Sequence, residues 1–201
     1  MASRDKNVIL EDFEWTDFWW DNRTVTAKTV LMIGDSQTRG MRPYFSQFCP
    51  DLKVDMFATS KCVDNPDYMR ELKYTVDGYH YDIVFFSHGL HGWHLGIDDY
   101  IGKCGKILDY LKESAGRVIV ESCLPVAVPG EKFILDTVRN GIVNERNAAL
   151  KRLSEEKSME YIDLYSMAID RAEIRDIDGM HYNEKGYQLL ARQLTERSSW
   201  S

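Results

Sequence analysis

The residues with the clearest capacity for chemistry lie near the two ends of the chain. Close to the N-terminus, the stretch "LMIGDSQTRG" ends an apolar run in Gly34, Asp35 and Ser36. A serine between a strand and a helix has an exposed hydroxyl, and its backbone N–H can stabilise the oxyanion formed when that hydroxyl attacks a carbonyl. Taken alone, the stretch favours a simpler role, with Ser36 as the N-cap of the helix.

The second stretch, "DIDGMHYNEKGYQLLA", places Asp178 and His181 three positions apart just before an amphipathic segment. In a turn that leads into a helix, this spacing lets the carboxylate hold one imidazole N–H while the other ring nitrogen acts as a general base. The alternative is structural: Asp178 caps a turn, and His181 packs on Tyr182 or Tyr187.

A third stretch, "FFSHGLHGWH", contains His88, His91 and His94. The spacing is helix-like, but Gly89 and Gly92 favour a loop, and on an extended chain His91 would point away from the other two. No nearby Asp, Glu or Cys set completes a familiar zinc pattern. We therefore expect no metal here, and His88 and His94 to line a pocket or form local hydrogen bonds.

The elements that must position these residues follow from hydrophobic periodicity. Short apolar runs predict strands over 29–34, 53–58, 82–87, 117–122 and 160–165. Continuous apolar runs suit parallel strands covered on both faces. Helical spacing recurs over 97–111, 138–153 and 187–194. The alternation predicts an α/β three-layer sandwich with a five-stranded parallel sheet in flavodoxin-like order, whose functional groups gather at the carboxyl edge of the sheet.

One domain is expected over 28–201, preceded by an aromatic-rich arm over 1–27 that includes Trp15, Phe18, Trp19 and Trp20. Indole rings suit the apolar faces of sugars, but an N-terminal group of aromatics more often packs across a domain or in an interface. For Trp93, inside the histidine-rich stretch, contact with a sugar and structural packing are more evenly balanced as interpretations.

Composition narrows the classes of function. The net charge of −7 and the lack of a basic run argue against nucleic acid or an anionic membrane as a partner. No apolar stretch is long enough to span a membrane, and the N-terminus has no signal-peptide pattern. The four cysteines, none in a CxxC pair, predict free thiols, with Cys104 on a helix stripe and Cys123 at a strand end. We expect a cytoplasmic protein and leave open whether it forms a homo-oligomer.

Together, the strand-ending "GDS" and the "DxxH" before the last helix resemble the SGNH (GDSL-like) hydrolase superfamily over nearly the whole chain. The resemblance implies Ser36 as nucleophile and Asp178 and His181 as its triad partners. The family usually has GxND after its third strand, with the asparagine donating to the oxyanion; here "GLHG" (89–92) puts His91 in that place. An imidazole N–H is also a suitable donor.

In the same comparison, Lys61 is the nearest match to the family's second oxyanion donor, a glycine N–H. The expected oxyanion hole is therefore formed by Ser36, His91 and Lys61. The candidates for contact with substrate are Asp35, Trp93, His88 and His94.

These features predict a serine esterase that acts on small O-acyl esters, with O-acetyl groups of a carbohydrate as the expected substrate and no cofactor. Two alternatives stay open. The first is a carbohydrate- or ester-binding protein that kept the pocket but lost the chemistry, because both oxyanion positions depart from the family pattern. The second is a metal-assisted hydrolase built on the histidine-rich stretch. A lipase is less favoured, because no large exposed apolar lid segment is apparent.

Overall fold

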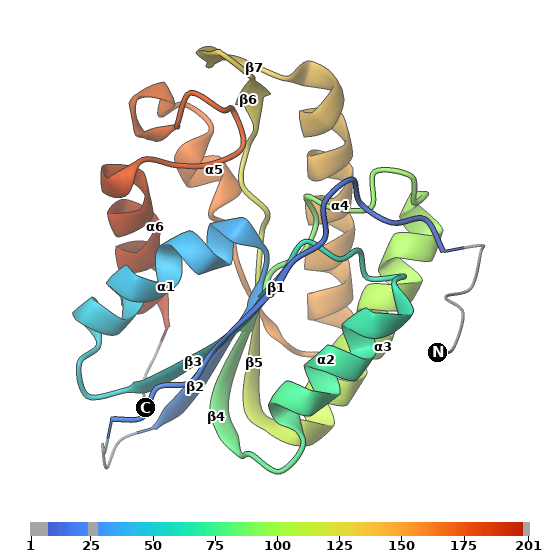
Figure 1. The fold of residues 1–201 in the computed structure, drawn as a ribbon, viewed down its shortest axis with the longest axis vertical. Coiled ribbons are helices and arrows are strands. Elements are labelled where there is room, and N and C mark those ends of the chain that lie inside the picture. Colours follow the sequence, from blue (N-terminus) through green and yellow to red (C-terminus); the bar gives the residue numbers. More distant parts are fainter. Residues whose placement is uncertain (1–7, 24–27, 199–201) are drawn as a thin grey trace.

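A computed structural model describes residues 8–23 and 28–198, which form an α/β sandwich around a six-stranded sheet (Figure 1). The strand order is β1-β3-β2-β4-β5-β8. The bounds are β1 Thr16–Trp19, β2 Thr29–Gly34, β3 Lys53–Thr59, β4 Tyr81–Phe86, β5 Ala115–Glu121 and β8 Glu160–Ile162.

The five predicted strands are all present, and they pair in parallel in the predicted flavodoxin-like order. The last is shorter than predicted, because the chain leaves the sheet after Ile162. The sixth strand, β1, was not predicted. It pairs antiparallel with β3, with Phe18 opposite Phe57, and so extends the sheet at the edge next to β3.

Helices cover both faces of the sheet (Figure 1). One face packs against α1 (Ser36–Phe48) and α6 (Glu184–Arg197), through a core that includes Phe45, Phe85 and Leu190. The other face packs against α2 (Pro66–Val76), α3 (Ile97–Ser114) and α4 (Thr137–Glu156). Because strands β2 to β5 are parallel and buried between these layers, the loops that follow them lie at one edge of the sheet.

Smaller elements frame that edge. A short hairpin joins β6 (Ala127–Val128) to β7 (Glu131–Leu135), and α5 (Tyr165–Ala168) and the 3-10 helix η1 (Ala172–Ile174) lead toward α6. In Figure 1 the hairpin stands next to the red-orange loop that precedes α6. No described helix is long and apolar enough to cross a membrane.

The described part of the predicted arm packs on the domain. The Trp15 backbone N–H donates to Ser60 Oγ (2.9 Å), and the buried Asp21 carboxylate accepts from the Val54 N–H (3.2 Å). Phe18 stacks on Phe57, with 5.6 Å between ring centroids. Residues 1–7 and 24–27 of the arm lie outside the described residues.

The four cysteines are free, as predicted. Cys104 and Cys123 are fully buried, the first within α3 and the second just after β5. Both therefore contribute to the core as small apolar side chains.

Candidate active site

Ser36 is the first residue of α1, and Asp35 is the residue that caps this helix. The Asp35 carboxylate accepts from the Gln37 backbone N–H at 2.9 Å. The simpler interpretation of Ser36 as the N-cap is therefore wrong, and its hydroxyl is not used for capping. As a first-turn residue, Ser36 also has a backbone N–H without an intrahelical partner, at the positive end of the helix dipole.

Asp35 was expected to contact substrate, but it is buried, with 4% of its surface exposed. Burial raises the pKa of its carboxyl, and the nearby charges of His91 and His181 oppose this rise. The contribution of Asp35 is thus to fix the start of α1, and a direct contact with substrate is not compatible with its burial.

Asp178 and His181 form the interaction that their spacing predicts. The Nδ1 atom of His181 lies 2.5 Å from Asp178 Oδ2, and both side chains are partly exposed. The other carboxylate oxygen accepts from the backbone N–H groups of Met180 and His181. Burial acts to raise the pKa of Asp178, but these hydrogen bonds, first that of the His181 ring, outweigh it and lower the pKa. Asp178 is therefore held ionised, with its charge directed at the imidazole.

The loop that carries this pair is anchored to the β6–β7 hairpin. The Ala127 N–H donates to Gly179 O (2.7 Å), and the Gly130 N–H donates to Ile177 O (2.8 Å). Gly179 has a φ of +78°, and a Cβ added there would lie 2.3 Å from Ala127 O. Only glycine fits this close approach without displacing the hairpin.

The Gln37 side chain joins the two stretches that carry the candidate catalytic residues. Its Nε2 donates to the carbonyl of Met180 (3.2 Å), and its Oε1 accepts from the Leu124 N–H (3.3 Å). Gln37 follows Ser36, and Met180 precedes His181. The buried Gln37 amide therefore holds the start of α1 beside the loop that carries His181. Sequence reasoning missed Gln37, because no local pattern shows that it reaches a segment more than 140 residues away.

On the oxyanion side, His91 faces the N-terminal segment. Its Nδ1 lies 3.6 Å from Glu11 Oε2, and the other Glu11 oxygen accepts from the Gly92 N–H at 2.6 Å. Burial acts to raise the pKa of Glu11, but these contacts with His91 and Gly92 lower it overall. Glu11 thus faces the Nδ1 side of the His91 ring and not its Nε2 atom. Sequence reasoning also missed Glu11, which lies 80 positions from His91.

Lys61 is not arranged as the expected oxyanion donor. Its backbone N–H donates to Thr59 Oγ1 (3.1 Å), within its own loop. Its ammonium group is nearly buried and forms an ion pair with Glu71 at 2.7 Å and a hydrogen bond to Thr16. Lys61 thus ties strand β1 to helix α2.

The histidine-rich stretch is a loop, as expected, but the expectation that His91 points away from His88 is wrong, because their ring centroids lie 5.9 Å apart. His88 was a candidate for substrate contact, but it is completely buried and packs edge-on against Tyr68. Burial, and then the nearby charges of His91 and Arg146, keep its pKa well below 6.5. His88 is therefore a neutral core residue, and its proposed contact with substrate is not compatible with this position.

His94 and Trp93 also have protein partners. His94 Nε2 lies 3.1 Å from Asp64 Oδ2. The Trp93 ring lies under the guanidinium groups of Arg146 and Arg139 at 5.5 and 5.9 Å, and it packs beside Leu90. For Trp93 the structural interpretation is thus the better supported of the two.

Several exposed apolar side chains lie near the loop that carries Asp178 and His181. Phe133 and Ile134 on β7, Val138 in the first turn of α4, and Ile177 beside Asp178 each expose more than half of their surface. These side chains come from separate segments, the hairpin, the start of α4 and the loop before α6, and do not form one continuous lid.

No known family model matches the sequence, and no curated protein matches it. Solved structures do. A mutant of Axe2, an acetyl-xylooligosaccharide esterase from Geobacillus stearothermophilus, has a TM-score of 0.65 and 14% identity, covering 88% of this chain and 97% of that chain. A member of the lipolytic G-D-S-L family from Veillonella parvula has a TM-score of 0.67 and 20% identity, covering 85% and 98%.

A third similar structure is LAE5, an alpha/beta hydrolase enzyme from the metagenome of Lake Arreo, Spain. Its TM-score is 0.67 at 14% identity, covering 86% of this chain and 95% of that chain. At these identities the likeness establishes the fold, which is that of the SGNH (GDSL-like) hydrolases.

Proposed function

We propose that this protein is a serine esterase that hydrolyses small O-acyl esters, with O-acetyl groups on carbohydrates as its substrate class. The observation that carries the proposal is the Gln37 amide, which joins the turn after β2 to the loop that contains the Asp178–His181 pair. This contact supports the proposal because it ties the helix start that carries Ser36 to the loop in which Asp178 already orients the His181 ring.

The comparisons support the chemistry and the substrate class. Three further solved structures of the Geobacillus stearothermophilus acetylxylan esterase, at 13–14% identity, are catalytic mutants of a serine, an aspartate and a histidine. In that enzyme the aspartate and the histidine are three positions apart, as Asp178 and His181 are here.

In the proposed mechanism, Ser36 Oγ attacks the acyl carbonyl while His181 Nε2 takes its proton. The tetrahedral intermediate collapses to a Ser36 acyl-enzyme, and His181 returns the proton to the oxygen of the leaving alcohol. Water then attacks the acyl-enzyme by the same proton transfers, which releases the acid and restores Ser36. Asp178 keeps the imidazole in the required tautomer and stabilises its charged form.

The oxyanion would be held by the Ser36 backbone N–H and by His91 Nε2. Helix N-termini and histidine side chains are both suited to developing negative charge. Because Glu11 faces Nδ1 of His91 and its carboxylate can only accept there, Nε2 donates to the oxyanion in the imidazolium form of His91, in which both ring nitrogens carry a proton.

The test is hydrolysis of p-nitrophenyl acetate and of acetylated xylo-oligosaccharides by wild type, Ser36→Ala and Ser46→Ala. Ser46 lies on the same helix, and its Oγ is buried without a hydrogen-bond partner among the described residues, so it is a matched control. We expect kcat to fall by about 10⁴-fold or more in Ser36→Ala, as for other triad nucleophiles, and to stay near wild type in Ser46→Ala.

Equal rates for wild type and Ser36→Ala on both substrates would contradict the proposal. Unchanged binding of acetylated sugar by both proteins, without turnover, would instead establish the binding-protein alternative. That alternative draws on Lys61, whose backbone N–H is already hydrogen-bonded within its own loop.

A further inference from the structure

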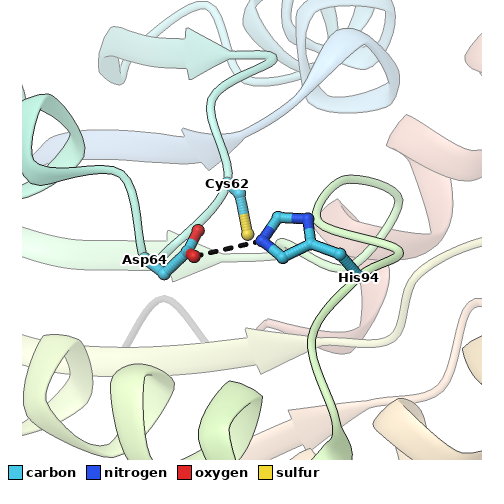
Figure 2. Close-up of side chains that lie close together, drawn as sticks. All are labelled: Cys62, Asp64 and His94. Atoms are coloured by element: carbon cyan, nitrogen blue, oxygen red, sulfur yellow. Dashed lines mark hydrogen bonds and ion pairs between the residues drawn. The ribbon is translucent and has the colours of Figure 1, made fainter. Parts of the chain in front are cut away.

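Three metal-ligating side chains that the proposed esterase mechanism does not use lie together beside the histidine-rich loop (Figure 2). The Sγ of Cys62, a carboxylate oxygen of Asp64 and a ring nitrogen of His94 all lie within 4.8 Å of one another. His94 Nε2 and Asp64 Oδ2 are closest, at 3.1 Å. Cys62 and Asp64 come from the loop after β3, and His94 comes from the loop after β4.

The fold brings these two loops together. Strands β3 and β4 both pair with β2, so the loops that follow them emerge on either side of the same strand. The contact is tight at Gly92, whose φ is +67° and whose added Cβ would lie 1.9 Å from Cys62 Sγ. The Cys62 thiol is therefore held at a fixed place against the histidine-rich loop.

The donor set has the chemistry of a zinc site. Thiolate sulfur, imidazole nitrogen and carboxylate oxygen are each ligands of Zn²⁺, and a combination of soft and borderline donors favours it over Mg²⁺ or Ca²⁺. Asp64 Oδ1 is buried and has no hydrogen-bond partner among the described residues. An ion in the cluster could bind this oxygen, Oδ1, while Oδ2 already faces His94.

The cluster also has a route to solvent. Cys62 exposes only 3% of its surface, but the side chains of Asp64 and His94 expose 22% and 25%. A tetrahedral zinc ion with bonds of about 2.0–2.3 Å separates its ligand atoms by about 3.5 Å. The Asp64–His94 pair, at 3.1 Å, would thus have to open slightly, and the donor pairs farther apart, all within 4.8 Å, would have to close by about 1 Å, which side-chain rotation can supply.

We propose that Cys62, Asp64 and His94 form a Zn²⁺ site that leaves one coordination position open. The bound ion would crosslink the loop after β3 to the loop after β4. Those loops also carry Lys61 and His91, so the site would stiffen the wall of the candidate active site. The proposal concerns metal binding and does not depend on the esterase activity.

The experiment uses the full chain, reduced with a phosphine and stripped of metal by a chelator. Co²⁺ is added as a spectroscopic substitute for Zn²⁺. We expect one Co²⁺ per chain, an intense near-ultraviolet sulfur-to-cobalt charge-transfer band and the visible bands of tetrahedral cobalt. Added Zn²⁺ should remove these bands by displacement and should raise the Tm, because the ion binds only the folded chain.

Variants then test each ligand. Cys62→Ser should abolish the charge-transfer band, while Cys49→Ser and His80→Gln should keep it, since neither belongs to the cluster. Should Cys62→Ser fail to fold by circular dichroism, Asp64→Asn and His94→Gln take its place, because both side chains reach solvent. Each should weaken Zn²⁺ binding by about 100-fold or more, since loss of an outer partner alone costs about 10- to 100-fold.

Absence of the charge-transfer band in the folded wild-type protein would overturn the proposal. A band that persists in folded Cys62→Ser, or Zn²⁺ affinity that is unchanged in both Asp64→Asn and His94→Gln, would overturn it as well. Any of these three results would mean that Cys62, Asp64 and His94 form a cluster that does not bind metal.

Discussion

The two sides of the candidate active site are built differently. The nucleophile side consists of the start of α1 and the loop with Asp178 and His181, joined by the Gln37 amide and by hydrogen bonds from the β6–β7 hairpin. The oxyanion side consists of the loops after β3 and β4, where Lys61 and His91 are occupied by other residues of the chain.

The two sides also differ in the contacts that hold them. The nucleophile side depends on contacts between α1, the β6–β7 hairpin and the loop with Asp178 and His181. The oxyanion side depends on the N-terminal segment, through Glu11, and on the cluster of Cys62, Asp64 and His94. We therefore expect substitutions on the nucleophile side to have the larger effects on the rate of chemistry.

Asp178→Asn should have the largest effect. The amide can still accept the loop N–H bonds, but its NH₂ group would face His181 Nδ1 and favour the wrong tautomer. We expect kcat to fall by about 10⁴-fold with little change in stability. Asp176→Asn, in the same loop, is the control. A loss of less than tenfold in Asp178→Asn would show that this side is not organised as a triad.

Glu121→Gln tests a buried carboxyl at the end of β5, on the nucleophile side. Burial, with a smaller contribution from the charge of Asp35, raises the pKa of Glu121 to about 8 from an ordinary value of 4.5. The folded state therefore holds a proton that the unfolded state releases between these two pH values. Stability is lost as pH rises through this window, by about 1.4 kcal/mol per pH unit at most.

The Glu121→Gln variant should lack this loss. Its unfolding free energy, measured with urea from pH 4 to pH 9, should exceed that of wild type by an amount that grows up to about pH 8, on the order of a few kcal/mol. Parallel pH profiles for the two proteins would mean that Glu121 is ionised or solvated in the folded state.

Gln37→Ala should have an intermediate effect on catalysis. Its loss removes the bonds to Met180 O and the Leu124 N–H, and the serine and histidine loops then lose their common anchor. We expect kcat to fall by about 10- to 100-fold with KM nearly unchanged, because misplacement by about 1 Å is enough for such a loss. Gln47→Ala, exposed on the same helix, should match wild type. A change in KM with kcat unchanged would show that Gln37 does not position His181 for catalysis.

Glu11→Gln should have the smallest effect of the series. It removes the charge that faces His91, but the amide oxygen of the variant can still accept from the Gly92 N–H. We therefore expect kcat to fall by only a few fold. His91→Asn, which restores an amide donor, should keep or raise the rate. If Glu11→Gln lowered kcat more than Gln37→Ala does, the oxyanion side would matter more for the rate than the nucleophile side, which would contradict the expected order.

The sequence by itself determined the parallel sheet, because continuous apolar runs such as 29–34 and 82–87 suit only strands that are buried on both faces. It also determined the Asp178–His181 pair. The two residues are three positions apart in one turn, so the interaction is local and its geometry follows from spacing.

Other features were decided only by the tertiary structure. The burial of His88 and the roles of Gln37 and Glu11 depend on contacts between segments far apart in the chain, which no periodicity reveals. The same holds for the cluster that joins His94 to Cys62 and Asp64, 30 or more positions earlier. These side chains became neighbours because β3 and β4 flank β2, and strand order places their loops at one edge of the sheet.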